Sequence, residues 1–109
     1  MSIFSKTKDL KLTNTAQITI IYPDGEINYA DIPEDGKDLM SALQETVGGY
    51  IEVIPFVSTG KYMVVNEMAK LSPHEINRVA TAIARDSCSI SKSDYIAGTV
   101  AIIERSLLL

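Results

Sequence analysis

Two arginines recur at helical spacing in the last third of the chain. His74, Arg78, Thr81 and Arg85 are separated by four, three and four positions, so in a continuous α-helix they point to one side. Two guanidinium groups on one helix face can hold phosphate oxygens through bidentate hydrogen bonds. The alternative interpretation is an ordinary solvated helix face.

Aromatic side chains alternate along the central part of the chain. Tyr50, Glu52 and Phe56 share one face of a predicted strand, and Tyr62 and Asn66 share a face of the next strand. Aromatic rings beside an asparagine amide suit a nucleobase, which stacks on rings and hydrogen-bonds at its edge. The alternative is that these rings belong to the core or to an interface. The candidate ligand-binding residues are therefore Phe56, Asn66, Arg78, Arg85, Tyr50 and Tyr62.

The residues that catalysis or metal binding usually needs are scarce. His74 and Cys88 are the only histidine and cysteine, and no His/Cys/Asp set has metal-ligand spacing. The sequence has no G-x-S-x-G motif, which in many hydrolases exposes a nucleophilic serine on a sharp turn. Carboxylates are numerous, but sequence alone cannot pair two of them across a bond, so acid–base catalysis stays open and unsupported. We expect a binding protein that is not an enzyme, with no catalytic residue, metal or cofactor.

Hydrophobic periodicity predicts the elements that position these residues. The expected elements are strands over 16–22 and 27–30, a helix over 37–47, strands over 50–57 and 61–66, a second helix, and a strand over 95–104. The order is ββαββαβ, which predicts an α+β fold with a mostly antiparallel sheet. Asp35 is the expected N-cap of the first helix. Gly48 and Gly49 follow that helix, so they are expected to form its left-handed C-cap and not a phosphate loop.

The second helix carries start signals of its own. Ser72 is the expected N-cap, Pro73 the first helical residue and Glu75 the acid of a capping box. The helix should fade near Asp86. Its buried stripe is predicted to be Ile76, Val79, Ala80 and Ile83, almost opposite the arginines.

Composition indicates one domain over 16–109, preceded by a flexible N-terminal arm over 1–15. The lone cysteine, the polar start and the lack of an apolar run of ~18 residues predict a cytoplasmic protein without a membrane partner. A net charge of −4 disfavours duplex nucleic acid as a partner. Acidic residues are concentrated over 24–38, which is typical of a solvated loop and helix start or, alternatively, of a protein-binding patch.

The strands are apolar on both faces, and this pattern bears on assembly. Two short helices packed on one face of a five-stranded sheet would leave the other face uncovered. We therefore expect a homo-oligomer, at least a dimer, with the Leu107–Leu109 tail as a further apolar contact. The alternative is that the N-terminal arm folds back over the sheet.

Three blocks carry a resemblance that covers about residues 38–103. The segments LQETVGGYIEV, GKYMVVNE and IAGTVAII resemble a family of small uncharacterised proteins encoded mainly on phages and plasmids. Its members carry a similar L-Q-x-x-V-G-G-Y-I-E block, a V-x-N-E strand and a closing G-T strand. More loosely, the chain resembles phage sponge proteins, such as the Thoeris anti-defence proteins, which sequester a nucleotide immune signal without cleaving it.

The resemblance to sponge proteins implies a function and roles for particular residues. It implies that a phosphorylated nucleotide messenger, either a cyclic oligonucleotide or a cyclic ADP-ribose-like molecule, is held by an oligomer. Phe56 would then stack on a base, Asn66 would bind a base or ribose edge, and Arg78 or Arg85 would bind phosphate. The alternative function is an acidic inhibitor of a host defence enzyme, of the anti-restriction or anti-CRISPR type, which would act through the acidic segment 24–38.

Overall fold

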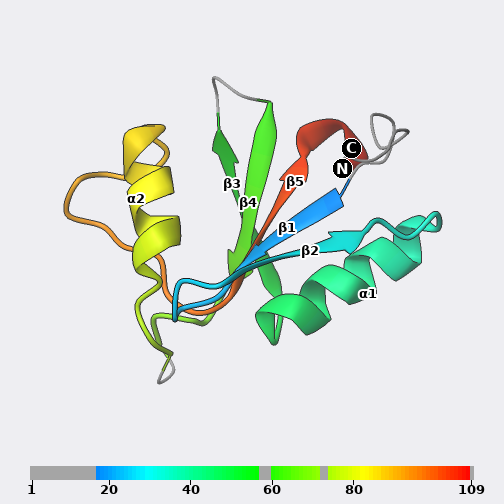
Figure 1. Ribbon diagram of the computed structural model, residues 1–109, viewed down its shortest axis with the longest axis horizontal. Coiled ribbons are helices and arrows are strands. Elements are labelled where there is room, and N and C mark those ends of the chain that lie inside the picture. The colour runs from blue at the N-terminus through cyan, green and yellow to red at the C-terminus, as the bar shows by residue number, and fades with distance from the viewer. Residues whose placement is uncertain (1–16, 57–59, 72–73, 109) are drawn as a thin grey trace, which may run out of the picture.

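The computed structural model describes residues 17–56, 60–71 and 74–108, and these form an antiparallel sheet with two helices (Figure 1). The five strands are ordered β2-β1-β5-β4-β3. The predicted α+β class and the order ββαββαβ are confirmed. The predicted arm over 1–15 lies outside the described residues. The elements are β1 (Gln17–Ile21), β2 (Ile27–Asp31), α1 (Gly36–Val47), β3 (Ile51–Phe56), β4 (Lys61–Asn66), α2 (Arg78–Asp86), β5 (Val100–Glu104) and the 3-10 turn η2 (Arg105–Leu107).

Helix α1 begins and ends where its capping residues predict. The Asp35 side chain accepts a hydrogen bond of 2.7 Å from the backbone N–H of Lys37. At the other end Gly48 has a φ of 85°, and its N–H donates to the carbonyl of Gln44 over 2.8 Å. That left-handed conformation is one that glycine adopts without strain, so the glycine pair closes the helix.

The two helices pack on opposite faces of the sheet, and the prediction that both cover one face is wrong. Strand residues alternate between two hydrophobic clusters, since Val64 belongs to one cluster and Met63 and Val65 to the other. The α1 cluster contains Ile18, Ile20, Leu39, Leu43, Val47, Val64, Ala101 and Ile103. The α2 cluster contains Ile21, Phe56, Met63, Val65, Ala80, Ala84, Ile96 and Val100. Figure 1 shows α1 and α2 on the two sides of the sheet.

This arrangement gives another reason for strands that are apolar on both faces. Each face carries a helix of the same chain, so a second copy is not required to cover the sheet. Leu107 and Leu108 are half-buried and pack against the α1 cluster, so they do not form the exposed tail that the sequence suggests. Leu109 lies outside the described residues. None of the described helices is long and apolar enough to cross a membrane.

Helix α2 begins at Arg78, later than the predicted start at Pro73, and Asn77 is its N-cap. The residues before it are extended because they pair with the chain just ahead of β5. The N–H of Asn77 donates to Ile96 over 2.8 Å, and the N–H of Gly98 donates to Glu75 over 2.8 Å. These tertiary hydrogen bonds exclude the predicted capping box at Glu75. Its other members, Ser72 and Pro73, lie outside the described residues.

The same pairing shortens the closing strand. Ile76 and Ala97 form an isolated antiparallel bridge, and β5 proper starts at Val100 and not at Tyr95. The connection between α2 and β5, residues 87–99, therefore crosses beside the helix instead of joining the sheet at once. We refer to it below as the α2–β5 segment.

Candidate functional site

A hollow of about 330 Å³ lies on the surface of α2, and both predicted arginines line it. We call it the α2 hollow. Its volume is at the lower end of the range for small-molecule sites, which is ~300–1,000 Å³. Among the described residues that line it, two are arginines and none is acidic. The lining residues are Ile76, Arg78, Thr81, Ala82, Arg85 and Tyr95.

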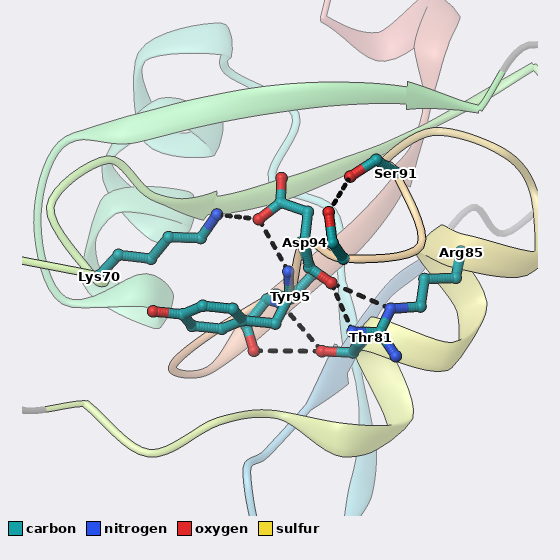
Figure 2. A network of polar contacts seen from close by, with 8 residues as sticks. Lys70, Thr81, Arg85, Ser91, Asp94 and Tyr95 are labelled. Atoms are coloured by element: carbon teal, nitrogen blue, oxygen red, sulfur yellow. Dashed lines mark hydrogen bonds and ion pairs between the residues drawn. The ribbon is translucent and has the colours of Figure 1, made fainter.

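The two arginines are held differently. Arg85 donates from Nε over 2.9 Å and from Nη2 over 2.6 Å to the backbone carbonyl of Asp94 (Figure 2). This pair of bonds fixes the guanidinium against the α2–β5 segment, and the remaining N–H groups are available to an anion. Arg78 is exposed and has no hydrogen bond or ion pair with another described residue. Its guanidinium can therefore turn toward a ligand without breaking an internal contact.

Buried polar residues hold the helix that carries these arginines. Asn77 is fully buried, and its Nδ2 donates to the carbonyls of Ile21 and Gly98 over 3.0 and 2.9 Å. Its Oδ1 accepts a bond of 3.0 Å from the N–H of Ala80. One side chain therefore ties the start of α2 to β1 and to the turn before β5.

Thr81 and His74 do not share the exposed helix face that the sequence predicts for them together with Arg78 and Arg85. Thr81 is buried, where its hydroxyl accepts from the N–H of Ile96 over 2.9 Å and donates to that residue's carbonyl over 3.3 Å. His74 precedes the helix, and its ring lies so close to Gly98 that a Cβ at that glycine would stand 3.2 Å from Cδ2. Of the four residues, Arg78 and Arg85 alone remain exposed helix residues that share a hollow.

Phe56 and Asn66 lie on opposite faces of the sheet. Phe56 is 5% exposed and belongs to the α2 cluster. Asn66 is on the α1 side, where its Nδ2 donates to the carbonyl of Val47 over 3.1 Å and its Oδ1 accepts from the N–H of Met68 over 2.7 Å. The amide of Asn66 thus joins the end of α1 to the turn after β4, and the sheet separates it from the ring of Phe56.

Tyr50 and Tyr62 also lie away from the α2 hollow. Tyr50 precedes β3 and is 73% exposed, and Tyr62 is half-buried against the α1 cluster. The structure therefore brings together two of the six predicted ligand-binding residues, Arg78 and Arg85. It places the other four, Tyr50, Phe56, Tyr62 and Asn66, outside their hollow.

A polar network around Tyr95 was not predicted from the sequence. Lys70 donates from Nζ to the Asp94 carboxylate, and its ammonium lies 4.8 Å from the centroid of the Tyr95 ring (Figure 2). The hydrogen bond from Lys70, followed by one from the backbone N–H of Tyr95, lowers the pKa of the Asp94 carboxyl. Lys70 and Asp94 are 24 positions apart, so no local spacing could have revealed their contact.

A second hollow of about 350 Å³ lies on the α2 side of β3 and β4, beneath the α2–β5 segment. We call it the β3–β4 cavity. Its walls include Ile54, Val65, Ile90 and Ile96, and its charged groups are Glu52, Glu67, Asp94 and Lys70. Tyr95 also lines it, and is the one residue that both hollows share. The cavity is therefore negative overall, in contrast to the α2 hollow.

The acidic segment 24–38 supports local structure at two points. Asp24 accepts a bond of 2.9 Å from the N–H of Glu26 in the turn between β1 and β2, and Asp35 caps α1. The turn and the helix start lie at the two ends of β2. Among residues 17–56, 60–71 and 74–108, no group of three or more His, Cys, Asp or Glu side chains is placed to hold a metal ion.

The chain matches one family model. The model described as a domain of unknown function, DUF3846, matches residues 16–106. That range spans the whole described sheet, both helices and both hollows. No curated protein and no solved structure matches the chain significantly.

Proposed function

The chain belongs to the DUF3846 family, and we propose that this member binds a phosphorylated nucleotide in the α2 hollow without cleaving it. The observation that carries the proposal is that Arg78 and Arg85 line one hollow together with Tyr95. In the proposed role the protein sequesters a cyclic nucleotide or cyclic ADP-ribose-like immune signal, as phage anti-defence sponge proteins do. The resemblance of the sequence to phage-borne proteins supports that role.

The chemistry of the lining supports a phosphate-bearing ligand. Guanidinium groups bind phosphate oxygens through paired, charge-assisted hydrogen bonds, and Arg85 is already oriented by the carbonyl of Asp94. No described residue that lines the hollow has a carboxylate, so an anion meets no acidic side chain among them. Tyr95, with Ile76 and Ala82, offers an aromatic and apolar surface on which a base can stack.

The lining also supports binding of the ligand without cleavage. Thr81 is the one aliphatic hydroxyl among the described lining residues, and it is engaged with both backbone groups of Ile96. The described lining includes no histidine or carboxylate that could activate a water or that hydroxyl. The ligand in this proposal is therefore recovered intact after the protein is denatured.

Self-association is a separate part of the proposal. The proposed phosphate-binding residues of the α2 hollow, Arg78 and Arg85, lie on one helix of one subunit. A second copy would instead cover apolar side chains that stay exposed on β2, such as Ile27 and Tyr29. Light scattering at micromolar concentration measures this part independently of ligand binding, and the mass of a monomer would exclude it.

Calorimetric titration with cyclic ADP-ribose isomers and with cyclic di- and trinucleotides tests the binding. Arg78→Ala and Arg85→Ala should each weaken it roughly tenfold or more, because each removes a charge-assisted hydrogen bond of ~1.5–3 kcal/mol. Tyr95→Ala should remove a stacking contribution of ~1–3 kcal/mol. Arg105→Ala is the matched control, since that arginine is exposed and does not line the hollow.

Two results would refute the proposal. One is that none of these nucleotides binds with a Kd below about 100 µM. The other is that mass spectrometry of the released ligand finds it hydrolysed. Phe56→Ala distinguishes an effect on the core from an effect on the binding site. It should lower the stability of the fold by removing a ring from the α2 cluster, and it should not remove a contact with the ligand.

A further inference from the structure

We propose that the β3–β4 cavity is a second binding site, and that it takes an alkylammonium group. The cavity has the volume of a small-molecule site, about 350 Å³, with an apolar wall and an acidic rim. An alkylammonium group matches both parts, because its methylene stem can lie against Ile54, Val65 and Ile96 while its charge meets the carboxylates.

The strand register places two glutamates beside each other at the rim. Glu52 pairs with Val65 across β3 and β4, and the ladder continues with the N–H of Glu67, which donates to the carbonyl of Tyr50 over 2.9 Å. Val65 and Glu67 are two positions apart, so Glu52 and Glu67 are diagonal neighbours on one face. Diagonal neighbours in an antiparallel pair are ~7–8 Å apart, a spacing at which one cation can interact with both carboxylates.

The charges of these two glutamates are not compensated within the described chain. Neither Glu52 nor Glu67 forms an ion pair or a side-chain hydrogen bond with another described residue. Among the described residues that line the cavity, Lys70 is the only cation, and its ammonium is directed to Asp94. Two like charges therefore face one cavity without a partner, which favours a ligand of opposite sign.

Lys70 itself shows how this rim receives an ammonium group. Its Nζ meets a carboxylate oxygen of Asp94 on one side and lies 4.8 Å from the centroid of the Tyr95 ring on the other. A carboxylate and an aromatic face are the two surfaces that recognise alkylammonium ions in proteins. The cavity presents further carboxylates next to that arrangement, at Glu52 and Glu67.

Two sources of the ligand share this chemistry, a free small amine and the side chain of a lysine in a peptide. Pentylammonium represents the first, and Nα-acetyl-lysine methylamide represents the second. Pentanoate has the same apolar stem with a negative charge, so it is the control for apolar binding alone. If pentylammonium binds and Nα-acetyl-lysine methylamide does not, the ligand is a free amine. If both bind, the cavity also accepts the side chain of a lysine.

The experiment is a titration of the isotope-labelled full chain, followed by backbone amide chemical shifts at low salt. Both glutamates lie at the rim, so each contact has the strength of a solvent-exposed ion pair. Glu52→Gln together with Glu67→Gln should weaken pentylammonium binding roughly threefold to tenfold. Glu45→Gln together with Glu75→Gln removes the same charge from exposed positions outside the cavity, and should leave binding unchanged.

Three results would overturn the proposal. They are an absence of saturable shifts at cavity residues, equal shifts with pentanoate, and equal weakening by the two double variants. The outcome is independent of the proposed nucleotide site, because a nucleotide should shift the amides of α2 around Arg78 and Arg85 in both double variants alike. Either site can therefore fail without the other.

Discussion

Asn77→Ala should be among the most damaging single substitutions in this domain. The side chain is fully buried and makes three hydrogen bonds, to the carbonyls of Ile21 and Gly98 and from the N–H of Ala80. Removing it takes away the N-cap of α2 and leaves two carbonyls short of a donor. It also disconnects the start of the helix from β1 and from the turn before β5.

The magnitude follows from these three contacts. Losing a helix N-cap costs ~0.5–2 kcal/mol, and a buried polar group left without its partner costs ~1–3 kcal/mol. Both carbonyls can relax somewhat, so we expect a total loss of about 3–5 kcal/mol in the free energy of unfolding. Domains of this size have ~5–15 kcal/mol in all, so the expected loss is a large fraction of the total stability.

A second variant distinguishes the contribution of the N-cap bond from that of the two bonds that Asn77 donates. Asn77→Asp keeps an oxygen that can accept from Ala80, but it turns a carboxylate oxygen toward the carbonyls of Ile21 and Gly98. It should therefore lose at least as much stability at pH 7 as Asn77→Ala. Burial should raise the pKa of the new carboxyl, so its stability should increase as pH falls from 7 toward 5 and the group regains a donor.

Urea unfolding followed by circular dichroism measures these differences. The matched control is Asn28→Ala on β2, whose exposed side chain accepts a bond from the N–H of Tyr29, next to it in the chain, and makes no other hydrogen bond with a described residue. That variant should stay within about 0.5 kcal/mol of the wild type. A loss below about 1 kcal/mol for Asn77→Ala, or wild-type stability for Asn77→Asp at pH 7, would refute the reasoning.

Two further predictions concern charged groups. The pKa of Asp94 is lowered in the folded protein, first by Lys70, so this pair stabilises the fold at neutral pH and its contribution is lost as pH falls through a folded-state pKa below 3.8. Asp94→Asn should flatten the acid limb of stability measured by urea unfolding, and an unchanged limb would contradict the assignment. Asp24→Asn, Glu26→Gln and Glu34→Gln combined should change stability by no more than ~1 kcal/mol, because these side chains are exposed. If that folded triple variant loses activity in a phage-defence assay, the acidic inhibitor function is favoured over sequestration.

The parts of the fold that were predicted correctly are those governed by local signals. Asp35 and Gly48 act within a few residues of themselves, and they mark both ends of α1. The alternation that predicts strands over 16–22 and 27–30 is local too, and these strands pair as β1 and β2. Each of these decisions is made by neighbouring residues, so a single sequence contains the information.

The start of α2 could not be predicted, because distant residues decide it. The sequence offers a capping box at Ser72, Pro73 and Glu75, but the backbone of Glu75 and Asn77 pairs with residues 96–98. Asn77 is itself a good N-cap, and without its contacts to β1 and the turn before β5 nothing distinguishes the two starts. The shift of the start also explains why His74 is outside the helix.

The placement of the helices was missed for a related reason. Strands that are apolar on both faces are compatible with a covered second face, whether the cover is a second copy or a helix of the same chain. Helical periodicity predicted Ile76 in the buried stripe of α2, but Ile76 is exposed and precedes the helix, while Thr81 is buried. Periodicity also does not indicate which face of the sheet receives the helix. In β4, Val64 faces α1 while Met63 and Val65 face α2. All three are apolar, so the sequence alone does not assign either helix to either face.

The arrangement around Asp94 links the two proposed sites through one short segment. The backbone carbonyl of Asp94 accepts two hydrogen bonds from Arg85, which lines the α2 hollow. The carboxylate of Asp94 holds Lys70 at the negative β3–β4 cavity. Tyr95 follows directly and lines both hollows. Because the carbonyl belongs to the backbone, Asp94→Asn removes the charge beside Lys70 while it keeps the bond to Arg85. The variant should therefore alter alkylammonium binding and spare nucleotide binding, whereas displacement of the whole segment, as expected for Asn77→Ala, should weaken both.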